Sequence, residues 1–70
     1  MRSFDILVER DRETGLYVGS VPGWPGANSQ GAILKELEKT LREVIEMRLE
    51  DGDPELESEF VGMNTIWVDG

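Results

Sequence analysis

The sequence predicts an α+β fold in which one helix packs on one face of a small antiparallel sheet, with the element order β-β-β-α-β. Two short β-rich segments joined by a polar connection predict a hairpin near the N-terminus. An amphipathic stretch over residues 33–49 predicts a single helix, and a β-rich segment over residues 60–68 predicts a last strand. We expect residues 1–70 to form one domain.

The first strand is expected over residues 3–9, where apolar and mostly polar residues alternate with a period of two. Its strongly apolar face carries Phe4, Ile6 and Val8. Residues 11–15 are polar and end in glycine, which is typical of a hairpin connection. The second strand is expected over residues 16–21 and antiparallel to the first.

A segment rich in proline and glycine, residues 17–31, joins the second strand to the helix. Pro22 and Pro25 fix φ near −65° and lack a backbone donor, so the strand must end at Val21. Three glycines permit positive φ or a close backbone approach, as in a tight double turn, namely Gly23, Gly26 and Gly31. The short piece 27–30 fits either a third strand or a loop.

The helix is expected over residues 33–49 because its apolar side chains recur at spacings of three and four. They are Ile33, Leu34, Leu37, Leu41, Val44, Ile45 and Leu49. Gly52 is placed as a left-handed residue at the helix end, and Pro54 prevents continuation.

Both faces of the last predicted strand, residues 60–68, carry apolar side chains. A sheet with one helix covers only one face, which suggests that a partner subunit covers the other. We expect Val61, Met63 and Trp67 to form an oligomer interface. The alternative is that Trp67 lies over the sheet edge of its own chain. Because a chain of this length buries a small core, we expect a homo-oligomer, a dimer or tetramer.

Composition excludes several kinds of chemistry. The chain contains neither cysteine nor histidine, so it has no disulfide, no thiolate zinc site and no Ser-His or Cys-His pair. We expect no enzyme activity and no cofactor. A carboxylate cluster for magnesium is the weaker alternative, because Asp5 and Glu9 lie about 13 Å apart along an extended strand and Asp11 and Glu13 fall in the hairpin turn.

The net charge of −8 argues against direct binding of nucleic acid and favours a basic partner. An acidic surface that merely keeps the protein in solution is the alternative. No leader-like start and no apolar stretch of membrane-spanning length is found, so we expect a cytoplasmic protein without membrane contact.

The Gly-Leu-Tyr-Val strand, the Pro-Gly-Trp-Pro-Gly turn and the following Ser-Gln-Gly and helix resemble the HicB family of antitoxins over roughly the first fifty residues. The resemblance implies a truncated ribonuclease H-like fold and favours a third strand for residues 27–30. HicB-like helices usually open with an Asp-Thr pair, where this chain has Ala32 and Ile33. Capping is therefore expected from Ser29, from Asn28 or from water.

Many HicB antitoxins also carry a C-terminal DNA-binding module, and none follows the last predicted strand here. The resemblance implies an antitoxin that binds and neutralises a basic, mRNA-cleaving HicA-like toxin. A solitary HicB-like oligomeric domain without a toxin is the alternative.

Partner-binding positions are expected at five residues. Trp24 lies on a rigid turn and is a candidate anchor, although its ring could instead cover the start of the helix. The other four are acidic loop residues that could meet a cationic surface, namely Asp11, Glu13, Asp51 and Asp53.

Overall fold

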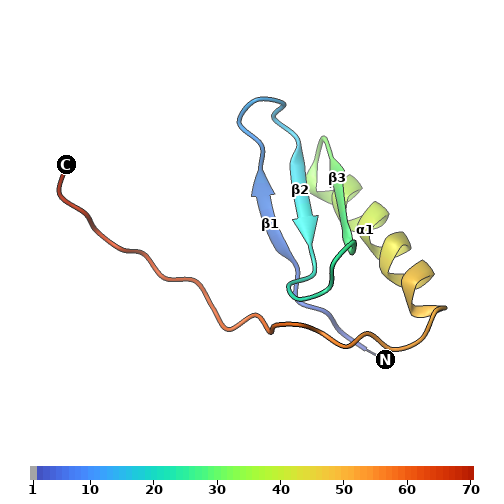
Figure 1. The fold of residues 1–70 in the computed structure, drawn as a ribbon. Helices are drawn as coiled ribbons and strands as arrows, with labels where there is room; N and C mark the ends of the chain where they lie inside the picture. The colour runs from blue at the N-terminus through green and yellow to red at the C-terminus, as the bar shows by residue number, and fades with distance from the viewer. Residues whose placement is uncertain (1) are drawn as a thin grey trace.

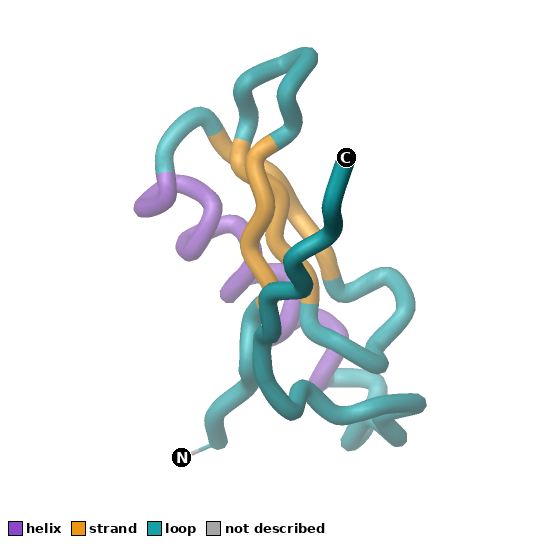
Figure 2. Tube along the Cα trace, turned by 90° about the vertical axis from the view of Figure 1, so that its left-hand side faces the viewer, coloured by secondary structure: helices purple, strands orange, loops and turns teal. Residues whose placement is uncertain are grey.

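The computed structural model describes residues 2–70. Three strands precede one helix, and their bounds are β1 Leu7–Arg10, β2 Tyr17–Ser20, β3 Asn28–Gly31 and α1 Leu34–Leu49. The strands form an antiparallel sheet in the order β1-β2-β3 (Figure 1). Figure 2 shows α1 lying on one side of this sheet. The predicted α+β class, with one helix on one face of an antiparallel sheet, is confirmed.

The register of the sheet places two small residues, Gly19 and Ser29, side by side beneath the helix. Val8 of β1 pairs with Gly19 of β2, which pairs with Ser29 of β3. A Cβ atom on Gly19 would lie 3.1–3.2 Å from methyl groups of Leu37 and Leu41. Because Gly19 has no side chain, the two buried leucines of the helix can pack directly on the sheet.

The two prolines and two glycines form consecutive β-turns between β2 and β3. The Trp24 amide donates to the Val21 carbonyl at 3.1 Å, and the Ala27 amide donates to the Trp24 carbonyl at 3.1 Å. Gly23 and Gly26 have φ of 81° and 85°, as the third residue of each turn requires. The turns bring Val21 and Ala27 together in the core, and the segment that follows forms β3.

The helix begins without a side-chain cap. Ile33 is its N-cap residue and makes no side-chain hydrogen bond there. Ser29, one of the expected caps, instead donates its hydroxyl proton to Thr40 at 2.8 Å and so ties β3 to the middle of the helix. At the other end Gly52 has φ of 112°, in agreement with the predicted helix stop.

The expected last strand over residues 60–68 is wrong for the single chain. The structure describes every residue of this segment and finds no strand there. A strand needs a neighbour that accepts its backbone hydrogen bonds, and the segment extends away from the sheet instead (Figure 1). The β-forming side chains alone do not supply that neighbour.

Candidate interaction surfaces

An apolar groove lies between α1 and the helix-facing side of β1. The helix packs directly on β3 and β2, and among the elements described its backbone does not come close to that of β1. The groove therefore opens where the helix stops covering the sheet. Its apolar lining comes from Phe4, Ile6 and Val8 on the strand side and from Leu34, Leu37, Leu41, Ile45 and Leu49 on the helix side.

The groove leaves apolar side chains partly in contact with water. Val8 is 43% exposed and Leu34 is 48% exposed, although both belong to the layer between sheet and helix. Charged side chains also line the groove, namely Arg2 near the N-terminus and Glu38, Arg42 and Glu46 on the helix. A groove of about 930 Å³ with this lining suits an apolar segment rather than a charged small molecule.

Residues 50–70, called the C-terminal segment below, cross one end of the molecule and then leave it (Figure 1). Asp53 forms an ion pair with Arg2 at 2.6 Å. The Glu57 amide donates a hydrogen bond of 2.8 Å to the Gly23 carbonyl of the double turn. These contacts fix residues 53–57 against the body. Beyond them the chain runs outward past β1.

The C-terminal segment has two chemically different parts. Residues 50–59 carry six acidic side chains, and Asp69 follows near the end. With no lysine or arginine, residues 50–70 account for seven of the eight units of net negative charge. Residues 60–68 carry no charge, and Trp67 is 91% exposed. An acidic run therefore leads into an uncharged, largely apolar run whose large apolar side chains are 42% exposed at Phe60 and 78–91% exposed beyond it.

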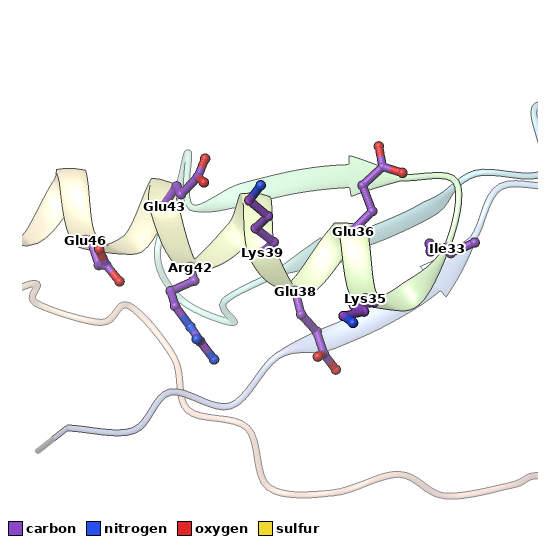
Figure 3. A pocket seen from close by; sticks show the side chains of 8 residues that line it. All are labelled: Ile33, Lys35, Glu36, Glu38, Lys39, Arg42, Glu43 and Glu46. Carbon is purple, nitrogen blue, oxygen red and sulfur yellow. The ribbon is translucent and has the colours of Figure 1, made fainter.

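The outer surface of α1 is different in character. Figure 3 shows its charged side chains projecting away from the helix. Three basic residues, Lys35, Lys39 and Arg42, alternate there with Glu36, Glu38, Glu43 and Glu46. The surface is close to neutral, so it lacks the one-sided charge of the C-terminal segment.

The expected acidic partner-binding residues do not form one cluster. Asp11 and Glu13 belong to the β1–β2 connection at one end of the sheet, whereas Asp51 and Asp53 follow the helix at the other end (Figure 1). Asp11 also has a structural role, because its Oδ1 accepts hydrogen bonds from the amides of Glu13 at 2.8 Å and Thr14 at 3.3 Å.

Trp24 is half-buried and packs against the N-terminal segment. Its ring centroid lies 5.5 Å from that of Phe4, with the rings tilted by 38°. The guanidinium carbon of Arg2 lies over the Phe4 ring, 5.3 Å from its centroid. The ring does not cover the start of the helix but joins the double turn to the chain before β1.

The expected interface residues Val61, Met63 and Trp67 are all strongly exposed. They lie on the part of the C-terminal segment that extends from the body, so Trp67 does not cover the edge of its own sheet. Over residues 2–70 no group of three acidic side chains is arranged to hold a metal ion. In the same part of the chain no helix is long and apolar enough to cross a membrane.

Three curated proteins align with almost the whole chain. A UPF0150 protein of Synechocystis is 43% identical over 67 residues, covering 96% of each chain. The chain belongs to the UPF0150 family. A UPF0150 protein of Thermotoga maritima is 39% identical and covers 94% of this chain and 89% of its own. One from Archaeoglobus fulgidus is 38% identical, with 93% of both chains covered.

No protein-family model matches this UPF0150 protein, and no solved structure shows significant similarity to it. Two features of its surface were not predicted, namely the concentration of negative charge in residues 50–70 and the apolar groove. The concentration of charge in residues 50–70 is readable from the sequence by comparing acidic and basic counts along the chain. The apolar groove has no such signal, because it depends on which strands the helix covers.

Proposed function

We propose that this UPF0150 protein is a non-enzymatic antitoxin of the HicB kind, which binds and neutralises a basic, mRNA-cleaving HicA-like toxin. The observation that carries the proposal is the separation of charge along the chain. Residues 50–70 hold seven acidic side chains and no basic one, and nearly all of this segment is exposed. The rest of the chain is almost neutral.

Electrostatics favours a cationic partner for the C-terminal segment. Closely spaced carboxylates on an exposed segment create a local negative potential that attracts basic surfaces and repels phosphate backbones. A toxin that cleaves RNA presents a basic RNA-binding face. An acidic segment laid on that face would exclude RNA by occupying the same cationic side chains.

A solitary oligomeric domain without a toxin is the second candidate. It is favoured by the apolar part of the segment, residues 60–68, and by the apolar groove. Both surfaces can be buried between copies of this chain without any other protein.

Titration calorimetry against a small basic protein encoded beside the gene tests the first candidate. We expect tight binding that weakens as salt is raised, and no binding of RNA or DNA by this chain. Absence of binding heat at every salt concentration, or retention of this chain by nucleic acid, would overturn the antitoxin proposal.

A matched pair of triple variants locates the contact. Glu55→Gln, Glu57→Gln and Glu59→Gln together remove three charges from the C-terminal segment, and we expect slower association and a weaker salt dependence. The control removes three charges from exposed positions on the body that do not line the groove, through Glu9→Gln, Glu36→Gln and Glu43→Gln. Equal losses in both variants would mean that net charge matters and the segment does not.

A further inference from the structure

We infer that two copies of this chain exchange residues 60–68, each segment lying along the free edge of β1 and over the apolar groove of the other copy. The exchange needs no toxin and is independent of the antitoxin proposal. The exchange would fill the apolar groove and would bury residues 60–68, both of which are exposed in the single chain.

The groove has the shape and lining that a strand requires. Ile6 and Val8 point into it from the β1 side, and Leu41 and Ile45 from the helix. Val8 shares its cross-strand row with Gly19 and Ser29, both of which lie beneath the helix. The helix covers the β2 and β3 positions of this row but not the β1 position, so the inward side chains of a strand added at the β1 edge would fill the space beside the helix.

The segment has matching chemistry. Residues 60–68 carry no charged side chain, and Val61, Met63 and Trp67 lie on one face of an extended chain. Their exposed fractions are 89%, 78% and 91%. Nine extended residues span about 30 Å, which exceeds the length of β1. One face of the segment can therefore cover the groove along its whole β1 side.

Of the two free sheet edges, that of β1 suits the added strand better than that of β3. β1 pairs with β2 on one side only, so its other edge has unpaired backbone groups. The outer edge of β3 is also free, but β3 is the polar sequence Asn-Ser-Gln-Gly and no apolar groove adjoins it. A strand added at β1 buries its apolar face, whereas one added at β3 does not.

A second copy is the occupant that the chain itself supplies. Each copy holds one groove and one exposed segment, so a two-fold exchange buries both in both copies at once. In the single chain Glu57 is bound to Gly23, and the segment then runs outward past β1 instead of turning into its own groove. The small core, with Val21, Ala27, Leu37 and Leu41 as its buried apolar residues, gains most from such burial.

Sedimentation equilibrium of the full chain is the first test, and we expect a dimer of twice 7.9 kDa. Met63→Glu places a charge on the groove-facing side of the segment and should raise the dimer dissociation constant roughly tenfold or more. Met47→Glu is the matched control, because Met47 is 61% exposed on the helix and does not line the groove. Equal effects of the two variants, or a monomer at micromolar concentration, would overturn the exchange.

The second test separates exchange from other dimers. A mixed dimer of isotope-labelled and unlabelled chains should give nuclear Overhauser contacts between Met63 or Trp67 of one copy and Ile6 or Val8 of the other. Contacts confined to one copy would show that the segment folds back on its own sheet. A dimer whose Trp67 stays accessible to an aqueous quencher, measured in Trp24→Phe, would show that the segment is not at the interface. Either result overturns the inference.

Discussion

Ser29 and Thr40 connect the edge of the sheet to the centre of the helix. The Ser29 hydroxyl donates to Thr40 Oγ1 at 2.8 Å, and Thr40 in turn donates to the carbonyl oxygens of Glu36 and Leu37, each at 3.1 Å. Both side chains are half-buried. The threonine thus satisfies its own donor within the helix and still accepts a proton from β3.

We expect this bond to be measurable by a double-mutant cycle. Ser29→Ala and Thr40→Val should each lower the free energy of unfolding by about 1 kcal/mol, with a coupling energy of about 0.5–1.5 kcal/mol between them. Urea denaturation of the four proteins gives the cycle. Ser20→Ala is the control, since Ser20 makes no side-chain hydrogen bond in the part of the chain described and should cost less.

Gly26→Ala should destabilise the protein by about 1 kcal/mol or more. Gly26 has φ of 85°, where a side chain is strained, and the Arg48 guanidinium at the end of its flexible side chain would also have to move away from an added Cβ. Thermal and urea unfolding measure the loss. Gly62→Ala, outside the left-handed region and on the face of residues 60–68 opposite Met63, should leave stability unchanged. Parent-like melting of Gly26→Ala would contradict the strained turn.

Gly31→Ala should cost more than Gly19→Ala. A Cβ on Gly31 would lie 2.8 Å from the backbone nitrogen of Leu37, so the helix itself would have to move. A Cβ on Gly19 meets only leucine methyl groups at 3.1–3.2 Å, and these can shift. Overpacking of this kind costs about 1–3 kcal/mol. The opposite order in urea denaturation would show that the helix tolerates displacement at β3.

Asp11 should matter for folding, and its neighbour Glu13 should not. Asp11→Ala removes the acceptor for two turn amides and should cost about 1 kcal/mol, whereas Asp11→Asn keeps an oxygen in that place and should cost less. Glu13→Gln is the control, because among the described residues its side chain makes no hydrogen bond. If all three variants unfold alike, the carboxylate is not holding the turn.

Much of the fold follows from local chemistry and was predictable. The double turn depends on Pro22, Gly23, Pro25 and Gly26, whose allowed φ values are properties of single residues. The helix depends on an apolar stripe, and its observed range of Leu34–Leu49 differs from the prediction by one residue. The exposed acidic charge is likewise a property of composition.

Strand formation was decided by the neighbours of each segment. Residues 28–31 are polar and glycine-containing, yet they form β3 because β2 pairs with them in register. Residues 60–68 are rich in β-formers, yet they form no strand in the single chain. A strand is completed by hydrogen bonds to another strand, so its own side chains do not determine its state.

The sequence by itself determined the turn, the helix and the distribution of charge, since each of these depends on residues close together in the chain. Only the tertiary structure decided where the helix lies. The bare backbone of Gly19 and Gly31 lets Leu37 approach β2 and β3, and this placement leaves β1 uncovered. The apolar groove exists because residues distant in sequence meet there, which no local pattern encodes.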